Sequence, residues 1–272
     1  MSSTATFRIW RGDANNGKFE DYQTAVTDGM VVLDAVHQIQ ATQAPDLAVR
    51  WNCKAGKCGS CSAEVNGRPR LTCKTRLTDF EPGEEITVEP MRTFPLIKDL
   101  VTDVSWNYEV NKTIAPFTPP TDMPQEDWRW QQEDIERVQE YRKCIECFLC
   151  QDVCHVLRNH ETERPFMGPR YLVRAAGLEL HPIDQADRRP YLKDSGGIGY
   201  CNITKCCTEV CPEHIKITDN AIIPLKERVA DEYYDPLRWA WRKMRGEGSG
   251  SGDRVELPVL QGEPAAPEQA PD

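Results

Sequence analysis

Alternating polar and apolar positions in the first hundred residues predict strands with one buried face. Residues 6–10 follow this period of two, and the Asn-Asn-Gly turn at residues 15–17 tolerates a positive φ, so a hairpin is expected to start here. Apolar residues then recur at helical spacing over residues 32–39. This spacing predicts one short helix after the hairpin.

Two further strands are predicted on either side of an Asn-Gly pair. Residues 62–65 and 68–71 flank Asn66-Gly67, a strong short-range hairpin signal, and residues 85–88 offer another strand. The order strand, strand, helix and further strands predicts a β-grasp domain over residues 1–105.

Beyond Pro90 the hydrophobic pattern becomes helical. Four prolines between residues 116 and 124 predict an extended connection. Helical spacing follows over residues 134–143, 168–178 and 217–234, the second with a proline in its first turn. We therefore expect a helical domain over residues 106–245 and an α+β fold for the chain.

The end of the chain has a different composition. Gly, Ser, Pro and Glu dominate residues 246–272, where six acidic residues stand against the single Arg254, so we predict a disordered acidic tail. The stretch before it, residues 238–245, is basic and aromatic. Trp beside Arg and Lys suits a membrane interface, and basic residues equally complement a helix end, so both interpretations stand.

The amino-acid composition narrows the classes of protein to which this chain can belong. With 272 residues, 39% hydrophobic and 28% charged, the chain resembles an ordinary soluble protein of two domains. A net charge of -10 argues against nucleic acid as a partner. No apolar run approaches the roughly 18 residues that span a bilayer, so membrane association is expected through a partner. The start, Met-Ser-Ser-Thr, lacks an apolar signal segment and suggests the cytoplasm, including the inner face of a membrane.

All twelve cysteines fall into three groups along the chain. They are Cys53, Cys58, Cys61 and Cys73, then Cys144, Cys147, Cys150 and Cys154, then Cys201, Cys206, Cys207 and Cys211. The first group begins with the C-x4-C-x2-C spacing of plant-type ferredoxins, which hold a 2Fe-2S cluster. The second is the C-x2-C-x2-C-x3-C run of bacterial ferredoxins, whose fourth cysteine serves a different cluster from its first three. A chain with both spacings is predicted to carry electrons.

Disulfides, zinc and a Rieske centre fit these cysteines less well. Disulfide frameworks belong to small secreted chains, and zinc usually takes two C-x2-C pairs separated by a longer gap. A Rieske centre needs two histidine ligands, but only His155 lies next to a cysteine of these groups. In the loop over residues 53–61, Gly56 and Gly59 allow the backbone to turn its N–H groups toward sulfur.

Two glycine motifs imitate nucleotide sites. Residues 12–18 follow the G-x4-G-K pattern of a phosphate loop, but Phe19 stands where a hydroxyl residue would hold magnesium, so a hairpin turn is predicted there. Residues 196–199 lack the G-x-G-x-x-G register, and neither flavin nor nicotinamide has a predicted site. Electrons are therefore expected to enter from another protein.

A plant-type cluster domain followed by C-x2-C-x2-C-x3-C and then C-x5-C-x3-C-P resembles the iron-sulfur subunit of succinate dehydrogenases and fumarate reductases. The resemblance covers about residues 4–240. It implies three ligand sets: Cys53, Cys58, Cys61 and Cys73 for a 2Fe-2S cluster, Cys144, Cys147, Cys150 and Cys211 for a 4Fe-4S cluster, and Cys154, Cys201 and Cys207 for a 3Fe-4S cluster.

The resemblance also implies an electron relay. In that family succinate is oxidised at a flavin in a separate subunit, and electrons pass one at a time along three clusters to a quinone. The expected partners are an FAD-containing dehydrogenase subunit and a transmembrane anchor, through which quinone is reached, at the cytoplasmic face of the inner or plasma membrane. Fumarate reduction stays open as the reverse direction. Three other identities also stay open for this chain: a cluster subunit of another flavin dehydrogenase, a heterodisulfide reductase-like relay and a zinc-stabilised scaffold.

Several positions depart from the family pattern or bear on the third cluster. Cys206 is an extra cysteine, which we interpret as free and buried. His155 stands in place of a frequent proline, and Arg158 and Asn159 replace the aromatic pair that contributes to the quinone pocket, so this subunit is expected to contribute little to that pocket. Thr204 occupies the position where a fourth thiolate would complete a cube, which predicts a 3Fe-4S cluster because a hydroxyl is a poor iron ligand.

Overall fold

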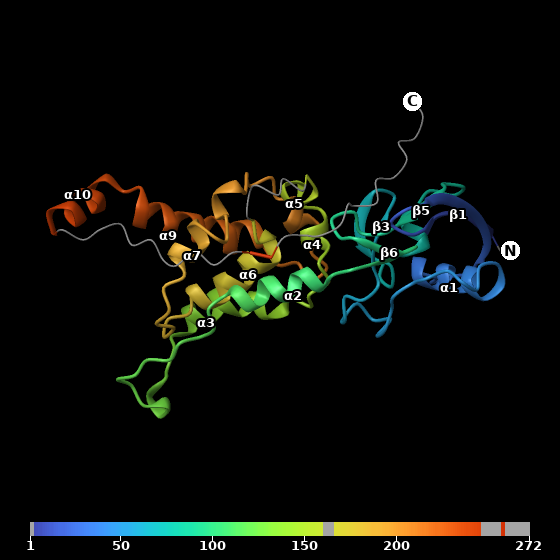
Figure 1. Cartoon of the computed structure of the whole chain (residues 1–272). Helices are drawn as coiled ribbons and strands as arrows, with labels where there is room; N and C mark the ends of the chain where they lie inside the picture. The colour runs from blue at the N-terminus through green and yellow to red at the C-terminus, as the bar shows by residue number, and fades with distance from the viewer. Residues whose placement is uncertain (1–2, 160–165, 246–256, 259–272) are drawn as a thin grey trace. The chain divides into compact units, whose positions relative to one another are not determined.

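A five-stranded mixed sheet lies at the centre of the N-terminal part of the chain (Figure 1). The computed structural model describes residues 3–159, 166–245 and 257–258. The strands are β1 (Ser3–Gly12), β2 (Gly17–Val26), β3 (Ser62–Val65), β4 (Arg68–Leu71) and β5 (Ile86–Glu89), and they lie in the order β2-β1-β5-β3-β4. β1 pairs antiparallel with β2 along its whole length and parallel with β5.

Helix α1 (Val32–Thr42) packs its apolar side against this sheet. Phe7 and Ile9 of β1 are fully buried, and so are Val36 and Ile39 of α1, in one hydrophobic core. The period of two along the strand and the helical spacing after it therefore meet in the same core. The predicted order of strand, strand, helix and further strands is confirmed.

The glycine-rich segment of residues 12–18 forms the turn between β1 and β2. Asp13 accepts hydrogen bonds at Oδ1 from the backbone N–H of Asn15 (2.8 Å) and of Asn16 (3.1 Å). The Asp13 N–H in turn donates to the Asn16 carbonyl at 2.9 Å. The segment is a hairpin turn, as predicted.

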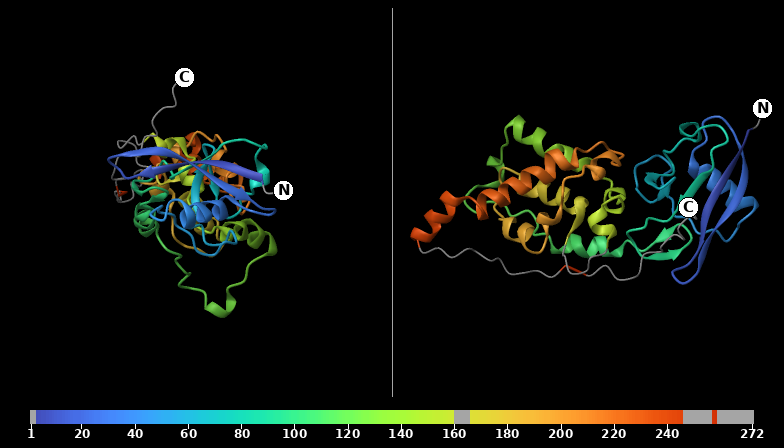
Figure 2. Two further views of the ribbon diagram at one scale, coloured as in Figure 1. Left: turned by 90° about the vertical axis from the view of Figure 1, so that its right-hand side faces the viewer. Right: turned by 90° about the horizontal axis from the view of Figure 1, so that it is seen from above.

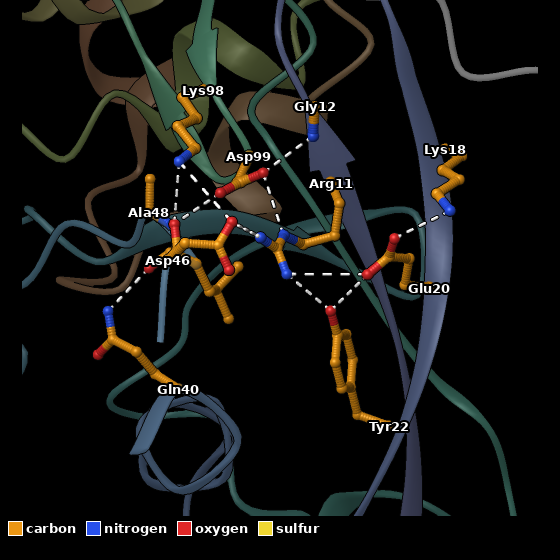
Figure 3. A network of polar contacts seen from close by, with 11 residues as sticks. Arg11, Gly12, Lys18, Glu20, Tyr22, Gln40, Asp46, Ala48, Lys98 and Asp99 are labelled. Carbon is orange, nitrogen blue, oxygen red and sulfur yellow. Dashed lines mark hydrogen bonds and ion pairs between the residues drawn. The ribbon is translucent and has the colours of Figure 1, made fainter. Parts of the chain in front are cut away.

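A buried carboxylate joins the end of β1 to the segment that precedes the first cysteines (Figure 3). Asp99 lies in the turn between β6 (Leu96–Lys98) and β7 (Val101–Thr102), which the sequence pattern did not reveal. Its Oδ1 accepts from Arg11 Nε (3.1 Å) and from Gly12 N (2.8 Å), and its Oδ2 accepts from Ala48 N (2.8 Å). This network fixes the approach to the cysteine loop.

By its contacts the chain divides into two units. The first holds the described residues up to Val104 together with Ile145–Val153, and the second holds Ser105–Cys144 and the described residues from Cys154 onward. The remaining elements, listed here in chain order, are α2 (Ser105–Thr113), η2 (Gln125–Asp127), α3 (Gln132–Gln139), η3 (Glu140–Lys143), α4 (Leu149–Asp152), α5 (His155–Arg158), α6 (Gly168–Glu179), α7 (Arg189–Lys193), η4 (Ile198–Tyr200), α8 (Cys206–Glu209), η5 (Ile217–Ile222), α9 (Ile223–Tyr233) and α10 (Pro236–Arg245).

The helices of the second unit match the predicted positions with two changes. The helix expected over residues 134–143 ends as α3 and continues as the 3-10 turn η3. The helix expected over residues 217–234 begins with the π-helix η5, and α9 starts just before Pro224. Because proline has no N–H to donate, the turn that precedes it cannot keep the regular α-helical ladder. Helices α2, α5, α7 and α8 of this unit were not predicted.

Helix α10 follows α9 at the end of the coloured ribbon (Figure 2). It carries an exposed apolar stripe. Leu237, Trp241 and Met244 lie four and three residues apart, on one helix face, and are 80%, 54% and 75% exposed. The side chains of Arg238, Trp239, Arg242 and Lys243 lie outside the described part. None of the helices in the described ranges is long and apolar enough to cross a membrane.

The predicted acidic tail lies outside the described residues apart from Leu257 and Pro258. The carbonyl of Pro258 accepts a hydrogen bond from Trp106 Nε1 at 2.6 Å.

Candidate iron-sulfur sites

The first cysteine loop points its backbone N–H groups at its own sulfur atoms. Ala55 N and Lys57 N each donate to Cys53 Sγ at 3.3 Å, and Cys53 N donates to Cys58 Sγ at 3.5 Å. Cys73 lies in the turn after β4. Backbone donors around sulfur stabilise thiolate charge and tune the potential of a bound cluster. This donor set fits the predicted 2Fe-2S cluster.

The backbone of this loop adopts the conformations that such a cradle requires. Lys54, Gly56 and Gly59 have φ values of 54°, 66° and 69°. Left-handed residues alternating with ordinary ones turn successive N–H groups to the same side, which makes a concave site for a negatively charged group. The sequence revealed the two glycines, but it gave no sign that Lys54 shares their conformation.

The thiols of the first group differ in acidity. Burial acts to raise the pKa of Cys58, but hydrogen bonds from Cys53 and Ser60 outweigh it and lower the pKa to about 6. Burial raises the pKa of Cys73 to about 12, and contact with the Cys61 thiol acts in the same direction. The four thiols thus influence one another within one unit. Iron must displace a proton from the buried thiols, since thiolates are the ligands.

The second cysteine run repeats the same backbone device without glycine. Glu146 and Phe148, on either side of Cys147, have φ values of 55° and 61°. Non-glycine residues enter this region rarely and at a cost of about 1–3 kcal/mol each, so they mark positions that the surroundings dictate. Cys147 and Cys150 lie in the first unit and are buried.

The first and second cysteine segments touch each other inside the first unit. Ser62 Oγ donates to the carbonyls of Gly59 and Cys147, each at 2.8 Å. A Cβ placed on Gly59 would lie 2.6 Å from Cys147 Cα. The chain therefore brings the loop of the predicted 2Fe-2S cluster into direct contact with a predicted ligand of the 4Fe-4S cluster. Ser62 could not be recognised from the sequence as the residue that bridges them.

Two further ligands of the predicted 4Fe-4S set lie in the second unit. Burial raises the pKa of Cys211, hydrogen bonds from the backbone of Ile215 and Glu213 oppose this, and Cys144 adds a charge effect that raises the pKa. His214, which follows closely, has a φ of 54°. The complete set of Cys144, Cys147, Cys150 and Cys211 includes residues of both units, and its convergence on one cluster stays a prediction.

The third cysteine group lines a cavity in the second unit. Its walls include Cys154, Cys201, Cys206 and Cys207, together with residues such as His155, Phe166, Ile203, Thr204 and Thr218. His155 Nε2 is buried and has no hydrogen-bond partner among the described residues. A cavity with several thiols and an unused nitrogen fits a cluster that presents sulfur acceptors.

The prediction that Cys206 is a free, buried cysteine is wrong about its burial, and whether it is free of the cluster stays a prediction. Cys206 is partly exposed and lines the same cavity as the predicted ligands. Helix α8 begins at Cys206, so two adjacent cysteines stand in its first turn at the cavity wall. Thr204 is exposed and its Oγ1 lies 3.4 Å from Cys206 Sγ.

Burial is the main cause of the raised pKa values of two thiols that line this cavity. It raises the pKa of Cys154 to about 12 despite the N–H groups of Leu157 and Val156, and it raises the pKa of Cys207 to about 11. Ile203 and Lys205 have φ values of 61° and 64°, which repeats the alternation seen at the other cysteine segments. A β-branched residue in this conformation is a strong sign of a functional loop.

In the described ranges no group of three or more His, Cys, Asp or Glu side chains is arranged to hold one metal ion. Cluster thiolates bind different iron atoms and therefore stand farther apart than the ligands of a single ion. The candidate sites are accordingly described by their N–H groups and backbone conformations and, for the third group, by its cavity.

Comparisons with known proteins cover most of the chain. Residues 6–109 match the family model of the 2Fe-2S iron-sulfur cluster binding domain, and residues 140–215 match that of the 4Fe-4S dicluster domain. The fumarate reductase iron-sulfur subunit of Mycobacterium tuberculosis is 33% identical over 202 residues, which cover 72% of this chain and 80% of that protein. The chain belongs to the family of succinate dehydrogenase and fumarate reductase iron-sulfur subunits.

Two further members of this family agree over more of the chain. The fumarate reductase iron-sulfur subunit of Wolinella succinogenes is 29% identical over 241 residues, which cover 85% of this chain and 96% of that protein. A chain in the structure titled Mycobacterium smegmatis Sdh1 complex in the apo form is 62% identical, with a TM-score of 0.84, and the match covers 87% of this chain and all of that chain.

Family membership confirms the resemblance and the α+β fold predicted from the sequence. The chain is an iron-sulfur subunit that relays electrons in a succinate or fumarate oxidoreductase complex, with 2Fe-2S and 4Fe-4S domains. The individual cysteine assignments stay predictions, and the geometry above is their support.

Proposed function

We propose that this iron-sulfur subunit works in the direction of succinate oxidation. Its partners would be an FAD-containing dehydrogenase subunit, which supplies electrons, and a transmembrane anchor, which receives them. The observation that carries this direction is the 62% identity to a chain of the Sdh1 complex, against 33% to the fumarate reductase subunit of Mycobacterium tuberculosis. Fumarate reduction by the same relay is the second candidate, because an electron relay transmits both ways.

We assign the cluster ligands as the spacing predicts. Cys53, Cys58, Cys61 and Cys73 hold the 2Fe-2S cluster, Cys144, Cys147, Cys150 and Cys211 hold the 4Fe-4S cluster, and Cys154, Cys201 and Cys207 hold a 3Fe-4S cluster. The N–H donors at Cys53 and Cys58 and the thiol-lined cavity at Cys154 support the first and third sets.

The clusters, when bound, supply one-electron chemistry. The protein sets the distance between them, buries their thiolate ligands and donates N–H hydrogen bonds to the sulfur atoms. Gly59 and Ser62 hold the 2Fe-2S loop against Cys147, which keeps the first transfer short. Burial of Cys154 and Cys207 excludes water from the third site and so influences its potential.

Association with the membrane is assigned to a partner and to helix α10, at the cytoplasmic face. Arg245 lies over the Trp241 ring, 4.6 Å from its centroid, at the edge of the exposed apolar stripe. An amphipathic helix with aromatic and basic residues suits the interface between lipid and water. Because Arg158 and Asn159 offer no aromatic wall, the quinone is assigned to the anchor or to a cofactor held there.

The test of direction is a comparison of the two reactions in one preparation of the membrane-bound complex. Succinate oxidation with a quinone and fumarate reduction with the corresponding quinol are measured at matched saturation. The proposal predicts a faster succinate reaction, and a faster fumarate reaction would assign the complex to fumarate reductases. Cys207→Ser should abolish quinone reduction in either case while succinate still reduces the flavin, because it interrupts the last relay step.

A further inference from the structure

Four thiols line the third cavity, although the assigned cluster uses three. Cys154, Cys201 and Cys207 are the assigned ligands, and Cys206 belongs to the same wall. An extra cysteine with no role would be expected away from the cavity or sealed in the core. Cys206 is neither, since it is partly exposed and faces the same space.

The surroundings of Cys206 place its sulfur among the assigned ligands. The left-handed conformation of Lys205, at φ 64°, turns the chain so that α8 starts with Cys206 at the cavity. Thr204, where a fourth ligand was expected from the spacing, is exposed, and its Oγ1 contacts Cys206 Sγ at 3.4 Å.

We propose that Cys206 is an exchangeable fourth ligand of the third cluster, which takes up ferrous iron to become a 4Fe-4S cluster. This inference rests on the proposed assignment of Cys154, Cys201 and Cys207. Thiolate is a far better ligand for iron than the Thr204 hydroxyl, so the open corner of the cluster is completed by Cys206. The partial exposure of Cys206 lets iron and a proton exchange with solvent.

The uptake step balances in atoms and electrons. The relay first delivers one electron, which reduces the [3Fe-4S] core from a charge of about +1 to about 0. Ferrous iron then joins this neutral core to give a [4Fe-4S] core of charge about +2, with no further change in electron count. The Cys206 thiol loses its proton to solvent and forms the new Fe–S bond. Reoxidation with loss of ferrous iron reverses the step.

This exchange would make the last relay site sensitive to iron and to the state of reduction. Cluster type is one determinant of reduction potential, so the 3Fe-4S and 4Fe-4S forms of the third cluster are expected to transfer electrons to the next acceptor at different rates. A complex held reduced, with iron present, would therefore differ in quinone reduction from the same complex kept oxidised. The structural requirement is one thiol at the open corner, which Cys206 supplies.

The experiment uses the purified whole complex, reduced with dithionite under anaerobic conditions and incubated with 57Fe-enriched ferrous iron before desalting. Mössbauer spectra are recorded in the reduced state. The near-isotropic paramagnetic signal of an oxidised 3Fe-4S cluster is recorded before reduction and again after the desalted complex has been reoxidised anaerobically with a mild oxidant, too weak to oxidise a 4Fe-4S core of charge about +2. In the wild type we expect uptake of about one iron per chain and loss of most of that signal, because a 4Fe-4S core replaces the 3Fe-4S core. Cys206→Ala should keep the signal and take up no iron, while the matched variant Thr204→Ala should convert as the wild type does.

The outcomes separate this inference from the proposed function. Conversion of Cys206→Ala to the same extent as the wild type would overturn it, and so would a wild type that keeps its 3Fe-4S signal throughout. If the wild type as purified already lacks the signal and Cys206→Ala shows it, the inference is supported. If neither chain shows a third cluster of either type, the assignment of Cys154, Cys201 and Cys207 fails, and the inference fails with it.

Discussion

Gly59 lies directly against Cys147, so that a Cβ on the glycine would come within 2.6 Å of the cysteine Cα and 2.9 Å of its Cβ. Gly59 follows Cys58 in the first cysteine loop, and Cys147 belongs to the second cysteine run. A glycine here does two things at once, because its φ of 69° also suits the left-handed turn of the loop. The contact sets the separation between the first two cysteine segments.

Gly59→Ala should therefore disturb both cysteine segments. The added methyl group cannot fit without moving the Cys147 backbone, so we expect loss of most of the 2Fe-2S and 4Fe-4S signals in paramagnetic resonance spectra. Gly67→Ala is the matched control, since Gly67 has a φ of 67° and nothing within 4 Å of the added Cβ. Gly67→Ala has the same unfavourable backbone conformation, at a cost of about 1 kcal/mol, but no steric contact, so this variant should keep its clusters. Equal loss in both variants would show that backbone conformation, and not the contact, matters.

The sequence predicted the strands of the five-stranded sheet well because they depend on local patterns. The hairpin around Asn66-Gly67 has the predicted strand bounds, and α6 covers the predicted helix of residues 168–178. The left-handed conformations of Phe148 and Ile203 could not be predicted, because their residue types disfavour them. Only contacts distant in sequence impose such conformations.

The same limit applies to single residues. Cys206 was interpreted as buried because the family spacing has no role for it, whereas the first turn of α8 places it at the cavity. The hairpin of β6 and β7 is held by the buried Asp99, whose partners Arg11 and Ala48 are far away in the chain. No hydrophobic pattern signals such a clamp.

Asp99→Ala should destabilise the first unit strongly. The carboxylate is buried and accepts from Arg11, Gly12 and Ala48, so its removal takes the acceptor away from Arg11 Nε and from two backbone N–H groups. Breaking a buried ionic pair costs about 3–5 kcal/mol, and we expect a clear fall in the thermal midpoint of the full chain. Asp46→Asn is the control, because Asp46 also binds Arg11 but is exposed, and its effect should be small. Comparable losses would contradict a special role of Asp99.

Alkaline pH should destabilise the metal-free chain more than the loaded chain. The pKa of Cys154 is raised to about 12 and that of Cys207 to about 11, mainly by burial. Above about pH 9 the unfolded chain loses these protons while the folded chain keeps them, so stability falls as pH rises toward those values. In the loaded chain iron holds the sulfurs as thiolates. The check is thermal unfolding between about pH 8 and pH 10, and a parallel decline in both forms would refute it.

Charged substitutions on α10 should weaken membrane association. Leu237→Glu and Met244→Glu each remove an exposed apolar contact, and burial of such side chains contributes about 1.5–3 kcal/mol, so retention on membranes should fall roughly tenfold or more. The measurement is the fraction of the chain retained in washed membranes. Ile97→Glu is the control, because Ile97 is 52% exposed on β6. Retention that stays at the wild-type level in the α10 variants would mean that this helix is simply solvated.

The central claim is that the chain passes electrons through three clusters, and succinate-driven reduction of the purified complex tests it most directly. Samples frozen at increasing times after mixing with succinate are examined by paramagnetic resonance and Mössbauer spectroscopy, alongside iron analysis. The assignment predicts about nine irons in this chain as purified, the sum of two, four and three, and reduction of the 2Fe-2S and third clusters within a turnover. Fewer irons, bound zinc, or clusters that stay oxidised while the flavin is reduced would contradict it.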